Sequence, residues 1–145
     1  MRPIHSLANR LITSTLKFVQ RFLVFPSQMT FSGQGSTEQL CAHVSRLGYK
    51  KVLLITDKIL VDLGLADKVK AAIESHQGEL VIYDGVLPDP TVTMVNEGLA
   101  MVQAQGCDAI IAMGGGSSID TAKGVAAAAT HDGIESLLGI LKLKR

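Results

Sequence analysis

The sequence predicts an α/β fold in which a parallel sheet carries helices on both faces. Short apolar runs of strand length alternate with longer segments of helical spacing, which gives the order β-α-β-α-β-α-β-α. The run VLLI at 52–55 is apolar throughout, as is typical of a strand buried on both faces of a parallel sheet. With 145 residues, 47% of them hydrophobic and 19% charged, the chain has the size and composition of one folded domain.

The N-terminal region is predicted to be a separate amphipathic helix. Apolar residues recur at helical spacing over 4–25, basic residues occupy the other side, Pro26 ends the pattern, and the first acidic residue is Glu38. We therefore divide the chain into an N-terminal amphipathic helical segment, 1–28, and a second domain, 29–145. Packing on the rest of the protein or on a partner subunit is the favoured interpretation of this helix. A helix on a membrane surface or a transit peptide would share its composition.

Apolar periodicity and turn residues place the other elements in order. Gly48 directly follows one helical stretch, and Gly106 stands where the C-cap of another belongs. The first of these helices is expected to carry Leu40, Val44 and Leu47 on one face. The predicted elements are strands over 29–35, 51–56, 79–83 and 108–113, helices over 36–47, 66–76, 92–105 and from 117 onward, and a Pro-rich loop over 84–91.

The run DAIIAMGGGSSIDTAKG at 108–124 combines a strand, a glycine loop and a helix start. The three glycines at 114–116 have no Cβ, so the backbone can take positive φ and a ligand can approach the bare main chain. Ser117 and Asp120 match the S-x-x-D pattern of a capping box. The first turn of such a helix offers free N–H groups and the positive end of the helix dipole, which together bind phosphate. The alternative interpretation is a tight strand-to-helix turn with an ordinary cap.

Two aspartates lie at the carboxyl edge of the predicted sheet, where parallel sheets bind their ligands. Asp57 comes directly after a strand, and its carboxylate can accept hydrogen bonds from both hydroxyls of an adenosine ribose while it repels a 2′-phosphate. Its alternative role is to begin a turn or to cap the following helix. Asp89, between two prolines, is predicted to lie in a stiff extended loop. The G-x-G-x-x-G fingerprint fails, because Ile119 occupies the position of its third glycine.

These residues resemble a known family. The segments ITDK at 55–58, YDGVLPDPT at 83–91 and GGGSSIDTAKG at 114–124 look like the N-terminal half of the iron-containing (group III metal-dependent) alcohol dehydrogenases, from about Met29 to the end. The resemblance implies a Rossmann-like dinucleotide-binding domain that uses NAD as its cofactor, since the position matching Asp57 selects against NADP. It also implies a cofactor-binding role for Asp57, Asp89, Gly115, Gly116, Ser117, Ser118 and Asp120.

The glycine motif contains two charged residues, Asp120 and Lys123, whose implied roles differ. Asp120 is expected to cap the helix or to bond a ribose hydroxyl, because a carboxylate beside the pyrophosphate would be repelled. Lys123 lies three residues further on the same helix face and can balance either Asp120 or the phosphates.

The family's metal site has no counterpart in this sequence. Family members continue into a helical domain, in which an aspartate and several histidines hold a divalent metal, usually iron or zinc. The four histidines here are scattered, with no H-x-x-x-H pair, so we predict no metal ligands and no catalytic residues in this chain. We interpret the chain as a fragment of an NAD-dependent oxidoreductase acting on primary or secondary alcohols or aldehydes. The fragment is expected to lack activity, and the metal is expected in the full-length enzyme only.

The expected partners are NAD(H), a small alcohol or aldehyde in the full-length enzyme, and further copies of the chain in a homo-oligomer. A net charge of +1 gives no argument for nucleic acid. Cys41 and Cys107 lie far apart without a CxxC motif, which favours free thiols in a reducing compartment. We therefore predict a cytoplasmic location.

Two other classes of function stay open. An ATP-binding phosphoryl-transfer domain can use a similar glycine loop, but the P-loop pattern G-x-x-x-x-G-K-[ST] is absent. A non-catalytic membrane-associated module rests only on the N-terminal helix. No apolar run approaches the roughly 18 residues that a membrane-spanning helix needs.

Overall fold

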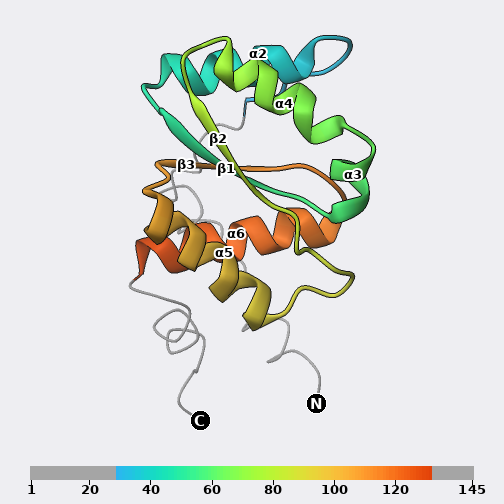
Figure 1. The fold of residues 1–145 in the computed structure, drawn as a ribbon, viewed down its shortest axis with the longest axis vertical. Helices are drawn as coiled ribbons and strands as arrows, with labels where there is room; N and C mark the ends of the chain where they lie inside the picture. The colour runs from blue at the N-terminus through green and yellow to red at the C-terminus, as the bar shows by residue number, and fades with distance from the viewer. Residues whose placement is uncertain (1–28, 132–145) are drawn as a thin grey trace, which may run out of the picture. The chain divides into compact units, whose positions relative to one another are not determined.

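The computed structural model describes residues 29–131, and the predicted N-terminal helical segment lies outside them. The described strands are β1 (Lys51–Ile55), β2 (Glu79–Tyr83) and β3 (Ala109–Ala112). They form one parallel sheet in the order β2-β1-β3, with Ile55 opposite Tyr83 on one side and Ala112 on the other. The predicted α/β fold with a parallel sheet is therefore confirmed (Figure 1).

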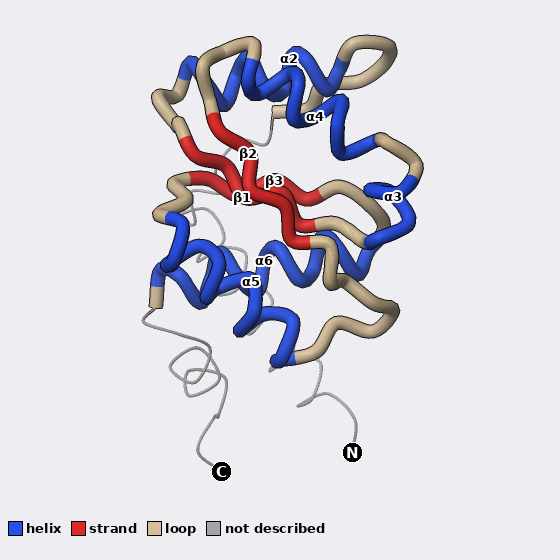
Figure 2. The backbone as a smooth tube through the Cα atoms, viewed as in Figure 1, coloured by secondary structure: helices blue, strands red, loops and turns tan. Residues whose placement is uncertain are grey.

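Helices cover both faces of this sheet. Helices α2 and α4 lie on one face and helices α5 and α6 on the other, whereas the short helix α3 follows β1 at the carboxyl edge (Figure 2). Their bounds are α2 (Ser36–Arg46), α3 (Lys58–Asp62), α4 (Leu65–Glu74), α5 (Val92–Gln105) and α6 (Gly116–Thr130).

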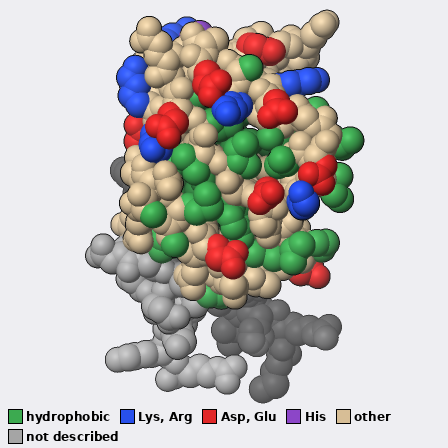
Figure 3. Space-filling view, viewed as in Figure 1, with side chains coloured by type: hydrophobic (Ala, Val, Ile, Leu, Met, Phe, Trp, Pro, Cys, Tyr) green, Lys and Arg blue, Asp and Glu red, His purple; other side chains and the backbone are tan. Residues whose placement is uncertain are grey.

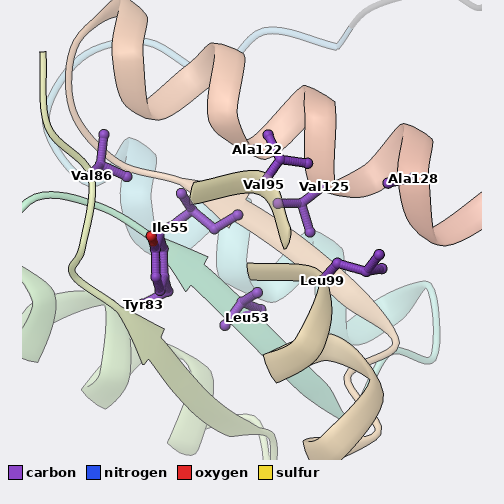
Figure 4. Close-up of a cluster of buried hydrophobic side chains, with 9 residues drawn as sticks. All are labelled: Leu53, Ile55, Tyr83, Val86, Val95, Leu99, Ala122, Val125 and Ala128. Carbon is purple, nitrogen blue, oxygen red and sulfur yellow. The ribbon is translucent and has the colours of Figure 1, made fainter. Parts of the chain in front are cut away.

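The central strand β1 is buried on both faces because each face packs against one pair of helices. Leu53 and Ile55 join a cluster with side chains of α5 and α6, which Figure 4 shows. Val52 and Leu54, which alternate with them, join a second cluster with side chains of α2 and α4. All four side chains are at most 1% exposed, which accounts for the uninterrupted apolar run in the sequence.

Helices α5 and α6 pack closely through two glycines. A Cβ added at Gly98 of α5 would lie 2.7 Å from Cγ2 of Val125 in α6. A Cβ added at Gly124 of α6 would lie 2.8 Å from Cγ2 of Val95 in α5. Each helix thus presents a glycine to a valine of the other, and the close approach of the two backbones depends on the missing side chains.

Asp108 fixes the start of β3 against the start of β1. Its Oδ2 accepts a hydrogen bond from the backbone N–H of Lys50 at 2.8 Å, and its Oδ1 accepts one from that of Lys51 at 3.0 Å. The N–H of Asp108 donates to the carbonyl oxygen of Lys51 at 2.8 Å. These three hydrogen bonds set the register of β3 against β1, and β3 leads into the glycine loop at the other edge of the sheet.

Two elements have the same first and last residues in the structure as in the sequence prediction. The strand predicted over 79–83 is β2, and the helix predicted over 92–105 is α5. The side chain of Thr91 caps α5 by accepting a hydrogen bond from the N–H of Met94 at 3.3 Å, and Gly106 ends the helix with φ 67. The two cysteines are free, as predicted.

One element prediction is wrong, and one short helix was not predicted. Residues 29–35 do not form a strand: Gly33 and Gly35 take φ 92 and 80, which turns the chain before α2, and no described strand pairs with this segment. The helix predicted over 66–76 is α4, but a separate helix α3 comes before it. Gly64, with φ 71, separates the two.

The face of α2 that carries Leu40, Val44 and Leu47 is only partly buried. Cys41 is fully buried, and Val44 packs beside it against the cluster under α2 and α4. Leu40 and Leu47 are 36% and 60% exposed instead. The side of α2 that carries Cys41 packs against α4. This orientation of α2 is set by the neighbouring helix rather than by the periodicity of α2 itself.

Large apolar side chains also reach the surface. Ile59 and Leu63 of α3 are 70% and 68% exposed, and Leu87 in the loop after β2 is 62% exposed. On the face seen in Figure 3, hydrophobic side chains gather across the middle, with charged side chains of both signs around them. Exposed apolar surface of this kind is typical of places that contact a ligand or another chain.

Candidate functional site

A pocket of about 460 Å³ opens at the carboxyl edge of the sheet. Its walls come from three segments: residues 57–60 after β1, residues 84 and 86–88 after β2, and residues 115–118 after β3. The chain passes from β1 to β2 on one side and then crosses to β3 on the other, so the strand order reverses at β1. In open α/β sheets the crevice at such a topological switch point is the preferred ligand site.

The glycine loop presents main chain to this pocket. Gly114 takes φ 139, and a Cβ there would come within 2.5 Å of the Ser118 Oγ and 3.4 Å of the Asp57 Oδ2. Gly115 and Gly116 have no positive φ, but nothing lies within 4 Å of the place where their Cβ would be. Gly114 therefore allows the tight turn, and the next two glycines leave open space for a ligand.

The predicted capping box is wrong. Helix α6 begins at Gly116, so Gly115 is its N-cap and no side chain caps the helix. Ser117 is already the second helical residue, and the Asp120 carboxylate accepts a hydrogen bond from Lys123 Nζ at 3.2 Å instead. Because no side chain caps the helix, its first-turn N–H groups are available to an anion, together with the positive end of the dipole of a 15-residue helix.

Asp57 serves as a cap and lines the pocket with the same carboxylate. It is the N-cap of α3, where its Oδ1 accepts a hydrogen bond from the N–H of Leu60 at 3.0 Å, as the alternative interpretation proposed. Its Oδ2 lies on the side of Gly114, close to the start of α6. The two oxygens therefore face different groups, and the cap leaves Oδ2 for a ligand.

The loop after β2 brings residues into the pocket that the sequence did not single out. Asp84, Val86, Leu87 and Pro88 line it, whereas Asp89 is exposed and lies outside the walls. The extended conformation predicted for Asp89 is wrong: its φ is 61, a left-handed value that aspartate tolerates better than most residues. Asp84 could have been identified as a site residue from the sequence. It directly follows β2, just as Asp57 follows the end of β1.

This loop is anchored on Tyr83, the last residue of β2. The Tyr83 hydroxyl donates to Oε2 of Glu97 in α5 at 2.6 Å, and burial, followed by this contact, raises the pKa of Tyr83. Gly85 lies against the phenol, since a Cβ there would be 2.8 Å from the Tyr83 oxygen. A backbone bridge joins Gly85 to Asp57, so the two walls of the pocket are held together.

Five of the seven predicted site residues therefore line one pocket, and two do not. Asp89 and Asp120 lie outside the walls. The lining residues that the sequence did not predict are Lys58, Ile59, Leu60, Asp84, Val86, Leu87 and Pro88. The residues that meet as predicted are Asp57, Gly115, Gly116, Ser117 and Ser118.

Within residues 29–131, no three His, Cys, Asp or Glu side chains come together as a possible metal site. No helix in that part of the chain combines the length and the apolar character needed to cross a membrane.

Comparison with known proteins identifies the family. The model of the family described as iron-containing alcohol dehydrogenase matches residues 26–145. The chain belongs to this family. The resemblance inferred from the three sequence motifs is therefore confirmed.

Alcohol dehydrogenases of several kinds are similar to this family member. Alcohol dehydrogenase 4 of Schizosaccharomyces pombe is 38% identical over 138 residues, which cover 89% of this chain and 32% of the relative. Lactaldehyde reductase of Escherichia coli is 42% identical over 99 residues, which cover 68% of this chain and 26% of the relative. This chain thus spans between a quarter and a third of the length of these relatives.

Solved structures of the family share the fold. A 1,3-propanediol oxidoreductase matches with a TM-score of 0.67 and 40% identity, over 70% of this chain and 26% of its own. The NADH-dependent butanol dehydrogenase A of Thermotoga maritima matches with a TM-score of 0.65 and 28% identity, over 74% of this chain and 29% of its own. The Rossmann-like architecture predicted for the chain agrees with these neighbours.

Proposed function

We propose that this chain is the dinucleotide-binding portion of an NAD-dependent, metal-dependent alcohol dehydrogenase, and that its pocket binds NAD(H). One observation carries the proposal: the uncapped start of α6 and the Asp57 carboxylate line the same pocket at the switch point of the sheet. An anion-binding group beside a carboxylate acceptor matches the diphosphate and the ribose of an adenine dinucleotide.

Each wall of the pocket has a part in this binding. The first-turn N–H groups of α6 would donate to the diphosphate, which Gly115 and Gly116 let approach the main chain. The free Oδ2 of Asp57 would accept hydrogen bonds from the adenosine ribose and repel the 2′-phosphate of NADP. The apolar side chains of Leu60 and Val86 would contact the adenine ring. Asp89 and Asp120 lie outside the walls, and we give neither a direct contact.

The reaction of the whole enzyme is proposed as oxidation of a small primary or secondary alcohol, or reduction of the aldehyde. When bound, NAD supplies the hydride acceptor. The family's divalent metal, iron or zinc, finds no fitting set of side chains within residues 29–131, so we assign it no step in this chain. The names lactaldehyde reductase and butanol dehydrogenase among the relatives support a small substrate.

Isothermal titration calorimetry with NAD and the 145-residue chain tests the proposed site. Gly115→Ala places a methyl group in open pocket space without a positive φ, so we expect NAD affinity to fall at least about tenfold while thermal stability is kept. Gly106→Ala is the matched control. It adds the same methyl group at φ 67 outside the pocket, and is expected to cost about 1–2 kcal/mol of stability with unchanged NAD affinity. Unchanged binding by Gly115→Ala, or no binding by the parent chain, would reject the proposal.

A further inference from the structure

Tyr83 connects helix α5 to the loop that walls the pocket. Its side chain is buried at the end of β2, in the cluster shown in Figure 4. Its hydroxyl donates to Oε2 of Glu97 in α5 at 2.6 Å, a length typical of a hydrogen bond to a charged acceptor. Burial raises the pKa of Tyr83, so the phenol keeps the proton that this bond donates. Glu97 therefore fixes the position of the hydroxyl end of the ring.

The main chain at Gly85 rests on that same end of the phenol. A Cβ added at Gly85 would lie 2.8 Å from the hydroxyl oxygen of Tyr83 and 2.9 Å from its Cζ. The residues on either side of Gly85 are Asp84 and Val86, and both line the pocket. A shift of the hydroxyl end of Tyr83 would therefore move this wall of the pocket.

The same loop also holds Asp57, which lines the pocket from the end of β1. A backbone bridge joins Gly85 to Asp57. Beside it, the N–H of Val86 donates to the carbonyl oxygen of Thr56 at 3.3 Å, and the N–H of Thr56 donates to that of Tyr83 at 2.9 Å. These contacts continue the pairing of β1 with β2 past the ends of both strands. The position of the Asp57 carboxylate therefore depends on the loop that rests on Tyr83.

Building on the proposed function, we infer that Glu97 is a positioning residue, which acts through Tyr83 to hold the Asp57 wall in the geometry that binds NAD. Helix α5 provides none of the residues that line the pocket, so Glu97 acts without touching the ligand. Binding groups give their full affinity only when neighbouring side chains hold them within about 0.5 Å of the required position. Without Glu97 the phenol loses its acceptor, and the ring turns toward another partner and displaces Gly85.

Calorimetric titration of the full 145-residue chain with NAD and with NADP tests the inference. Glu97→Ala should weaken NAD about five- to tenfold and NADP by less than about twofold, because a displaced Asp57 holds the ribose less well but also repels the 2′-phosphate less. Tyr83→Phe should give the same losses, since it removes the other partner of the same hydrogen bond. The double variant Glu97→Ala/Tyr83→Phe should lose no more NAD affinity than either single variant.

The ratio of the two affinities separates positioning from a general loss of stability. Lower stability reduces the folded fraction, which affects NAD and NADP equally. Glu97→Gln keeps an acceptor oxygen for the phenol, so its NAD affinity should stay within about twofold of that of the parent. Glu74→Ala is the matched control: it removes an exposed glutamate of α4, 3.8 Å from Lys70 Nζ and outside the pocket, and should change neither affinity.

The outcomes distinguish this inference from the proposed function. If Glu97→Ala keeps the NAD affinity of the parent, or weakens NAD and NADP by the same factor, the inference is overturned while the proposed function stands. Glu97→Gln as weak as Glu97→Ala would overturn it as well, and so would additive losses in the double variant. If the parent chain binds neither cofactor, both the inference and the proposed function are rejected.

Discussion

Replacing Gly98 by alanine tests whether α5 and α6 depend on their glycine contacts. The new Cβ would lie 2.7 Å from Cγ2 of Val125, which is 0% exposed and has no free space into which to move. A β-branched side chain in a helix is also held in one rotamer, so the neighbour cannot rotate away cheaply. We therefore expect the backbones of the two helices to separate, with loss of contacts in the cluster shown in Figure 4.

Two opposing effects determine how much stability Gly98→Ala loses. Alanine is the better helix former by about 1 kcal/mol in a helix interior. Overpacking a well-packed core costs about 1–3 kcal/mol, and the short contact at Gly98 places this site in the upper part of that range. We expect a net loss of about 1–2 kcal/mol in the free energy of unfolding, with a fall in Tm of about 4–8 °C for each kcal/mol.

Urea unfolding followed by circular dichroism measures this loss, and two further variants show its cause. Gly116→Ala introduces the same methyl group in α6 where nothing lies within 4 Å, so its stability should equal that of the parent. In the double variant Gly98→Ala/Val125→Ala the clash is absent. Its loss should be smaller than the sum of the single losses by about 1 kcal/mol. Gly98→Ala as stable as the parent, or strictly additive losses, would refute the packing argument.

Four further predictions follow from the site and the surface. Asp57→Ala should weaken NAD about tenfold and reduce the preference for NAD over NADP, as measured by calorimetry with both cofactors; equal effects on both would reject the role of Asp57. The raised pKa of Tyr83 means that the folded state keeps the phenol proton, so its stability contribution is full below about pH 10 and declines as pH rises further. Tyr83→Phe should therefore flatten the alkaline fall in stability, and an unchanged pH profile of urea unfolding would contradict this. The chain should form no NADH from simple alcohols with added ferrous or zinc ion, since residues 29–131 offer no metal cluster; NADH above a metal-only control would be evidence of activity. The exposed Ile59, Leu63 and Leu87 should promote self-association, and light scattering that gives a monomer mass at high concentration would exclude it.

Elements with local signals could be predicted from the sequence, and elements set by packing could not. The helix over 92–105 carries its own limits, because Thr91 caps one end and Gly106 the other. The segment 29–35 has strand-like composition, but a strand also needs a partner, and two glycines turn the chain away first. The buried face of α2 depends on its position against α4, which no periodicity within α2 encodes.

The pocket likewise combines residues whose positions the sequence predicts with residues whose positions depend on packing. Asp57 and the glycine loop directly follow strands of a parallel sheet, so their meeting at one edge follows from topology alone. The family resemblance implies a cofactor-binding role for Asp89, yet the loop before it is what lines the pocket. The path of that loop depends on long-range contacts, namely the bridge from Gly85 to Asp57 and the hydrogen bond from the N–H of Val86 to the carbonyl of Thr56 at 3.3 Å.

The absence of the predicted capping box at the start of α6 has the clearest functional consequence. Had Ser117 been the N-cap, its hydroxyl would accept hydrogen bonds from first-turn N–H groups and compete with any anion. The glycine loop starts the helix at Gly116 instead, and the N-cap Gly115 has no side chain with which to bond them. An uncapped helix end normally lowers stability, and here it borders the pocket and can bind an anion through main-chain donors. The same absence of a cap that weakens the isolated helix therefore provides the pocket with its phosphate-binding group.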